Sequence, residues 1–211
     1  PIASGGHATT LQKLHNFEQI FAIENDHNFN AGDYYEGSPP LKGLMTARMI
    51  GQKTFVSLEV LQGRARSGII QDEDDLKGYR LQHRIESYML HQAKKFVKKF
   101  DPNSYLCVIG MWQAFDLGRT AGGDLVKTFA PCTGQRYLNF SIDSDVCFFP
   151  DEQSQLTSAL KENDIPVQHI TVHSEKGHDS FLLEPELYTP HISFALNETF
   201  NEPETTRTCV S

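Results

Sequence analysis

A chain of 211 residues is long enough to bury a substantial core, which indicates one domain with an insertion or two small domains. Its 27 acidic residues outnumber its 19 basic ones, and the formal charge of −8 argues against binding to nucleic acid or anionic lipid. The longest apolar stretches are too short to span a bilayer, and the N-terminus lacks the pattern of a signal peptide. We therefore expect a cytoplasmic protein with no membrane and no nucleic-acid partner.

The first half of the chain predicts helices. Apolar residues recur at helical spacing in several segments, and the pair Pro39-Pro40 is tolerated in the first turn of a helix. Between these segments, Ser57 to Gly78 is mostly polar and carries an acidic cluster at 72–75, which we interpret as a solvated loop. The helices are expected over residues 7–25, 41–55, 80–100 and 104–116.

The second half has a different character. Short apolar runs at 136–143 and 167–174 predict strands, and residues 152–163 and 185–196 predict amphipathic helices. Strand, helix, strand, loop and helix in this order indicate a parallel sheet with right-handed crossovers. The sequence thus predicts a helical block that precedes the last part of an α/β sheet.

Two loops in this second half carry candidate catalytic groups. In open α/β sheets, functional groups gather where loops leave the carboxyl ends of the strands. Asp145 follows the first predicted strand, and His178 follows the second. Such a pair suits the acid and the base of a hydrolase triad in the chain order Ser, Asp, His. A surface histidine is the alternative for His178, and His169 and His173 are interpreted as structural.

The four cysteines give no sign of a metal or disulfide framework. They form neither a CxxC pair nor a zinc-ligand spacing, and disulfides belong mostly to small secreted domains, so we expect reduced thiols and no metal site. Apolar neighbours suggest packing roles for two of them, with a catalytic thiol as the alternative. The cysteines are Cys107, Cys132, Cys147 and Cys209.

Six segments resemble the homoserine O-acetyltransferase family of the α/β-hydrolase superfamily. They occur in the family's order and cover nearly the whole chain. The segments are GDYYEG (32–37), KGLMTARMIG (42–51), ESYMLHQAKKFVKKFDPNSYL (86–106), AFDLGR (114–119), SIDSDVCFFP (141–150) and GHDSFLLE (177–184).

The resemblance implies a fold class and a division of the chain. The fold would be α/β, the C-terminal part of an α/β-hydrolase with parallel strands, flanking helices and an inserted helical lid. Residues 1–9 would end a core strand, 10–118 would form the lid, 119–197 would form the C-terminal part of the core, and 198–211 would be a flexible tail.

The resemblance also implies an activity. Members of the family transfer an acyl group from a CoA thioester to the hydroxyl of homoserine, in methionine biosynthesis, by a ping-pong Ser-His-Asp mechanism. Acetyl-CoA or succinyl-CoA would be a co-substrate, and no bound cofactor is implied. By this resemblance Asp145 is the triad acid and His178 the base, Asp179 binds the substrate's ammonium group, and Arg48 binds its carboxylate. Phe55 stands where the family usually has Tyr, which leaves the acceptor open.

The nucleophile of such a triad is missing from the sequence. A nucleophile elbow needs small residues around the serine, as in GxSxG, and no such motif occurs. Ser4, in IASGGH, has no Gly two residues before it and is interpreted as a strand-end residue. Two or three strands also leave an edge and both faces of a sheet exposed. We therefore expect the C-terminal half of a larger enzyme, which is inactive without the N-terminal half that holds the serine.

Three functions stay open at this point. The first is a homoserine O-acyltransferase. The second is a related serine esterase or an acyltransferase for another alcohol, and the third is a noncatalytic piece that dimerises through the lid. Family members resemble homodimers joined through lid helices, and the two long helices expected between residues 80 and 116 suit that role.

Overall fold

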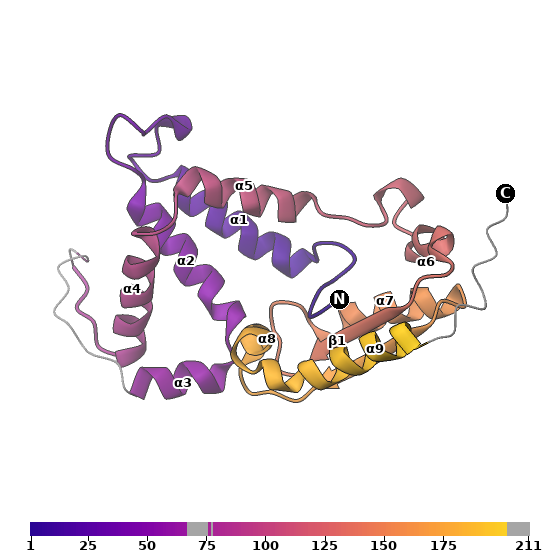
Figure 1. Cartoon of the computed structure of the whole chain (residues 1–211). Coiled ribbons are helices and arrows are strands. Elements are labelled where there is room, and N and C mark those ends of the chain that lie inside the picture. Colours follow the sequence, from indigo (N-terminus) through magenta and orange to yellow (C-terminus); the bar gives the residue numbers. More distant parts are fainter. Residues whose placement is uncertain (67–75, 77, 202–211) are drawn as a thin grey trace.

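The structure is a computed structural model that describes residues 1–66, 76 and 78–201. A helical part, formed by the first half of the chain, stands beside a smaller part in which helices flank a parallel sheet (Figure 1). The helical part contains α1 (Thr10–Glu24), α2 (Leu41–Phe55), α3 (Leu58–Arg66), α4 (Arg84–Val97) and α5 (Pro102–Ala114).

Local sequence explains where these helices begin. Thr9 and Gln12 form a reciprocal capping box at the start of α1, with N–O distances of 2.9 and 3.3 Å. At α5, the Asp101 carboxylate accepts from the N–H of Ser104 at 2.8 Å, and Pro102 occupies the first turn. The helix expected over residues 41–55 is confirmed at both ends, and the other three are confirmed with shifted ends.

The segment that follows α2 contains a helix that the sequence did not predict. Residues 58–66 form helix α3, within the mostly polar stretch 57–78. The hydroxyl of Ser57 accepts a hydrogen bond from the N–H of Val60 at 3.3 Å, and α3 packs on α4. Packing against α4 stabilises this helix, and the polar sequence of the segment gives no sign of that contact. The acidic cluster at 72–75 lies outside the described residues.

The α/β part is built on two parallel strands, as predicted. Strand β1 (Tyr137–Ile142) pairs in parallel with β2 (Val167–Val172), and α7 (Pro150–Glu162) connects them. On the other side of β1, Ile2 forms a parallel bridge to Phe140. Short helices α6 (Leu125–Phe129) and α8 (Ser180–Leu183) and the longer α9 (Thr189–Asn201) complete the part.

Two clusters form the core. One lies in the α/β part around β1, and the other joins α1, α2 and α5. The buried members of the first cluster are Ala3, Phe140, Ile142, Val172 and Tyr188, and those of the second are Ile23, Leu44, Ala47, Tyr105 and Ile109.

The helix expected at 185–196 is a single 3-10 turn followed by α9, and residues after 201 lie outside the description. Within the described part of the chain, no helix has the length and apolarity that a bilayer crossing requires.

Candidate active site

Asp145 and His178 meet just beyond the carboxyl ends of the two parallel strands. Oδ2 of Asp145 lies 2.8 Å from Nδ1 of His178, and the Asp145 side chain is fully buried while that of His178 is 18% exposed. An ionised carboxylate only accepts hydrogen bonds, so we assign the proton to Nδ1. That tautomer leaves Nε2 of His178 as a proton acceptor.

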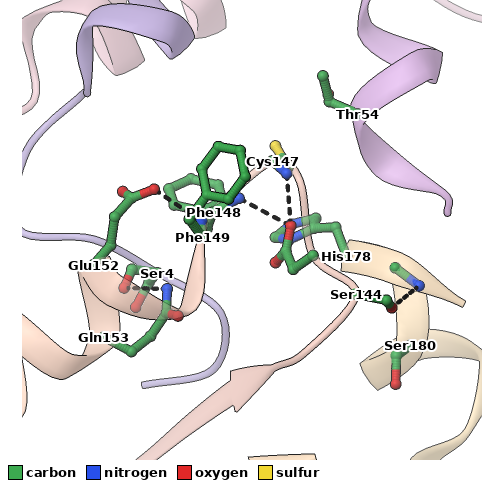
Figure 2. Close-up of polar contacts among 12 residues, drawn as sticks. Ser4, Thr54, Ser144, Cys147, Phe148, Phe149, Glu152, Gln153, His178 and Ser180 are labelled. Atoms are coloured by element: carbon green, nitrogen blue, oxygen red, sulfur yellow. Dashed lines mark hydrogen bonds and ion pairs between the residues drawn. The ribbon is translucent and has the colours of Figure 1, made fainter. Parts of the chain in front are cut away.

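The Asp145 carboxylate is held by backbone donors as well. Its Oδ1 accepts from the N–H groups of Cys147 and Phe148, at 2.7 and 2.9 Å (Figure 2). The turn after β1 thus satisfies both oxygens of a carboxylate that has no contact with water. The arrangement fixes the direction of the carboxylate toward the imidazole.

Aromatic rings fix the plane of the imidazole. Phe148 stacks on His178 with ring centroids 5.3 Å apart, and Phe181 meets it edge-on at 5.5 Å. Sequence reasoning did not single out either phenylalanine, because an apolar residue in a short run gives no signal that it faces a histidine. Their contacts restrict the ring rotation that would otherwise misalign Nε2.

The loop that carries His178 is held against the helical part. Gly177 has φ +73°, and a Cβ there would lie 2.6 Å from the backbone nitrogen of Ser57. The hydroxyl of Ser57 donates to the carbonyl of Glu175, and Ser144 accepts from the N–H of Gly177 at 3.0 Å. Only glycine permits this close approach of the α2–α3 turn to the histidine loop.

Arg48 and Asp179 lie near this pair and interact through charge. Arg48 donates from Nη2 to Oε1 of Gln52 at 2.7 Å, and its Cζ lies 4.7 Å from the ring centroid of Phe96. Burial lowers the pKa of Arg48, and the Asp179 charge opposes that shift. Burial raises the pKa of Asp179, against the nearby charges of His178, Arg48 and others. The cluster therefore presents both signs of charge in a partly desolvated setting.

A second Asp–His pair has the same contact distance but a different environment. Nδ1 of His173 lies 2.8 Å from Oδ2 of Asp143, with side chains 84% and 42% exposed. Water screens a pair of this kind, and no aromatic ring of the described residues packs on its imidazole. His169 is bonded to the hydroxyl of Ser141 at 2.6 Å. Burial, rather than distance, separates Asp145 and His178 from these.

The described residues place no nucleophile at His178. Within the described ranges, no hydroxyl or thiol is hydrogen-bonded to Nε2 of His178. The backbone carbonyl of Ser4 accepts from Gln153 at 3.0 Å, and Figure 2 shows Ser4 beside Gln153 rather than at the imidazole. Burial raises the pKa of the Cys147 thiol to about 12, which disfavours the thiolate.

Metal and disulfide chemistry find no support in the described part of the chain. No group of three or more His, Cys, Asp or Glu among those residues is arranged to hold a metal ion. Cys107, Cys132 and Cys147 form no disulfide among the described residues, and Cys209 lies outside the description.

Comparison with known sequences identifies relatives that are longer than this chain. A homoserine O-succinyltransferase of Bordetella pertussis is 37% identical over 171 residues, which are 79% of this chain and 41% of that protein. A homoserine O-acetyltransferase of Solidesulfovibrio magneticus is 35% identical over 171 residues, 77% of this chain and 41% of that protein. The chain thus spans less than half the length of these curated relatives. No family model matches it.

Comparison with solved structures shows the fold. A homoserine O-acetyltransferase from Bacillus anthracis superposes with a TM-score of 0.82 at 16% identity, over 93% of this chain and 52% of that one. Esterase E22 superposes with a TM-score of 0.79 at 19% identity, over 90% of this chain and 52% of that one. The described elements are therefore part of an α/β-hydrolase fold, as predicted. Identities this low carry no argument about the reaction.

Proposed function

This chain belongs to the same family as the homoserine O-acyltransferases, and we propose on that premise that the full protein transfers an acyl group from acyl-CoA to the hydroxyl of homoserine. The observation that carries the proposal is the buried Asp145 carboxylate bonded to Nδ1 of His178. It leaves Nε2 of an oriented imidazole free to take a proton. We propose that this reaction is a step of methionine biosynthesis in the cytoplasm.

The proposed mechanism has two half-reactions around a serine that lies outside this chain. Nε2 of His178 takes the serine proton as the serine oxygen attacks the thioester carbonyl, and the CoA thiolate leaves with that proton. The homoserine hydroxyl then attacks the acyl-serine while His178 takes its proton and returns it to the serine. Asp145 stabilises the imidazolium in both half-reactions without accepting the proton itself.

Arg48 and Asp179 are proposed to hold the acceptor's two charged ends. A guanidinium forms a two-pronged contact with a carboxylate, and Asp179 offers a negative charge to the ammonium group next to the catalytic base. Fixing both ends would place the hydroxyl of the acceptor at Nε2 of His178, and such positioning lowers the entropic part of the barrier.

The test uses the full protein with acetyl-CoA or succinyl-CoA and homoserine, and it measures release of free CoA. We expect His178→Ala to abolish the burst of acyl-enzyme formation. The matched control is His173→Ala, which breaks an equally short but exposed Asp–His pair and should keep the burst. Retention of the burst in His178→Ala would remove His178 from the mechanism. Fast ester hydrolysis without transfer to homoserine would instead favour a related esterase.

We also propose that the full protein is a homodimer joined through the helical part. Helices α1 and α5 lie side by side (Figure 1), and both carry exposed apolar side chains. An apolar patch of this kind is typical of an interface. Its members, with exposed fractions, are Leu14 (54%), Phe17 (57%), Phe21 (56%), Val108 (52%) and Met111 (62%).

The dimer proposal is tested by mass measurement of the full protein in solution. We expect Phe17→Asp to yield a monomer at concentrations where the unmodified protein is a dimer. The control is Leu196→Asp on α9, where Leu196 is 53% exposed but lies away from this surface. A dimer that survives Phe17→Asp and dissociates with Leu196→Asp would place the interface elsewhere.

A further inference from the structure

Three helices of the lid bring a second arginine and a phenol close to the proposed acceptor site. Arg48 belongs to α2, Arg64 to α3 and Tyr88 to α4, and α4 packs against both other helices. Nη1 of Arg64 lies 3.0 Å from the hydroxyl oxygen of Tyr88. The charge of Arg64 also acts on the carboxylate of Asp179. Arg64 therefore lies close enough to Asp179, and Tyr88 close enough to Arg48, for charge to act between them.

The Arg64 contact determines what Tyr88 can do. A guanidinium has only N–H donors, so the phenol oxygen accepts in this hydrogen bond and the phenol proton points elsewhere. Among the residues that the structure describes, none accepts that proton, and the Tyr88 side chain is only partly exposed. A phenol that accepts from a cation is also a stronger donor, because hydrogen bonds in a chain polarise one another.

The position of Tyr88 relative to Arg48 gives that donor a target. Arg48 lies against Phe96, on the same helix as Tyr88, and the Tyr88 phenol is one of the groups that act on the Arg48 charge. Phe55, the other ring beside Arg48, lies 5.4 Å from its Cζ and has no hydroxyl to contribute.

A rival phenol is already occupied. Tyr105 also acts on the Arg48 charge, but its hydroxyl lies 2.5 Å from Oε1 of Gln19 and donates to it. Its proton is therefore not available to a ligand, and Tyr88 is the phenol of the cluster with a donor to spare.

We propose that the Tyr88 hydroxyl, oriented by Arg64, donates a hydrogen bond to the acceptor carboxylate that Arg48 binds. The proposal rests on the proposed function for the identity of the acceptor, and it adds a binding residue and a positioning residue to that site. A carboxylate oxygen accepts several hydrogen bonds, so one carboxylate is able to engage the guanidinium and the phenol together. A site with two such donors selects acceptors that carry a carboxylate, because an acceptor without one leaves both donors unpaired.

The test compares homoserine with 3-aminopropan-1-ol, which is homoserine without its carboxylate, in the full protein. A hydrogen bond to a charged group implies that Tyr88→Phe raises the KM for homoserine by about 10- to 100-fold. The KM for 3-aminopropan-1-ol and the acyl-enzyme burst from acyl-CoA should stay unchanged. The matched control is Tyr79→Phe, which removes a phenol bonded to Glu86 at 2.8 Å on the exposed side of α4.

Arg64 is tested as a positioning residue by two single variants and one double variant. Arg64→Gln should raise the homoserine KM, and adding Tyr88→Phe to it should bring little further loss, because both changes remove the same donor. Arg64→Lys keeps a cationic donor and should restore much of the affinity. Neither variant should change the burst.

The outcomes separate the inference from the proposed function. If the unmodified protein transfers no acyl group to homoserine, the proposed function fails and this inference fails with it. If transfer occurs and Tyr88→Phe leaves the homoserine KM unchanged, or raises both acceptors' KM values equally, the inference alone is wrong. If Tyr88→Phe does not fold, the ratio of the two acceptors' KM values in Arg64→Gln decides, and an unchanged ratio overturns the inference.

Discussion

Replacing Gly177 by alanine tests whether the close contact between the α2–α3 turn and the histidine loop holds the site together. The substitution has two separate costs. A non-glycine residue at φ +73° pays about 1–2 kcal/mol for a left-handed backbone conformation. The new Cβ would also lie 2.6 Å from the backbone nitrogen of Ser57 and 3.0 Å from the carbonyl carbon of Val56, where neither atom is able to rotate away. Overpacking of this kind costs about 1–3 kcal/mol more.

A second glycine isolates the steric part of that cost. Gly122 has a similar φ of +67°, but nothing lies within 4 Å of a Cβ placed there. Gly122→Ala should therefore pay only the conformational cost of about 1–2 kcal/mol. The two variants should therefore differ in free energy of unfolding by about 1–3 kcal/mol, which is the steric cost of the contact between the α2–α3 turn and the histidine loop.

Thermal unfolding of the full protein and steady-state kinetics are the two assays. For a domain of 150–250 residues, 1 kcal/mol corresponds to roughly 2–4 °C, and for the longer full protein to less, so Gly177→Ala should unfold below Gly122→Ala by a small but measurable interval. Because the loop must move away from Ser57, acyl-enzyme formation should also fall in Gly177→Ala and remain normal in Gly122→Ala. Equal unfolding temperatures and equal activity in the two variants would refute the argument that the lid and the loop are locked together.

Three further predictions concern single groups of the site. Asp145→Asn should lower kcat roughly 10⁴-fold with little change in fold, since an amide stabilises the wrong imidazole tautomer, and Asp143→Asn should leave kcat unchanged in the same assay. Burial raises the pKa of Asp179 above its ordinary value of 3.8, so the folded state holds this proton to higher pH and loses stability as pH rises through that window. Asp179→Asn should therefore raise the unfolding temperature at pH 7 but not below pH 3.8, and it should also raise the homoserine KM. Equal changes of the unfolding temperature at both pH values would contradict this reasoning. The pKa of the Cys147 thiol is raised to about 12, so iodoacetamide at pH 8 should alkylate the exposed Cys107 at least about tenfold faster than Cys147 in the folded protein. Mass spectrometry reads the two labelling rates, and equal rates would contradict the burial of Cys147.

The sequence predicts the fold where local signals and tertiary contacts agree. For α2, the proline pair and the apolar spacing fix both ends, and the prediction matches the structure. The parallel pairing of β1 and β2 follows from their order with α7 between them. Helix α3 escapes prediction because few of its residues are apolar, and its stability depends on packing against α4, which no local pattern encodes.

The candidate site is likewise predictable from the sequence only in part. A rule about the carboxyl ends of parallel strands is enough to pair Asp145 with His178. That rule does not exclude the pair of Asp143 and His173, which has the same distance, because burial depends on the whole fold. The contact of Arg64 with Tyr88 joins two helices across 24 residues of sequence and carries no local signal at all.

The lock between the α2–α3 turn and the histidine loop has a consequence for how the acceptor range of such a protein evolves. Arg48 lies on α2, the helix that ends at this turn, and His178 and Asp179 lie on the loop that the turn contacts. Most changes along α2 should therefore disturb selectivity and rate together. Substitutions on α4 change the residues around the site without disturbing the contact between the turn and the loop. New acceptor preferences should therefore arise first on α4, in lineages that keep glycine at position 177.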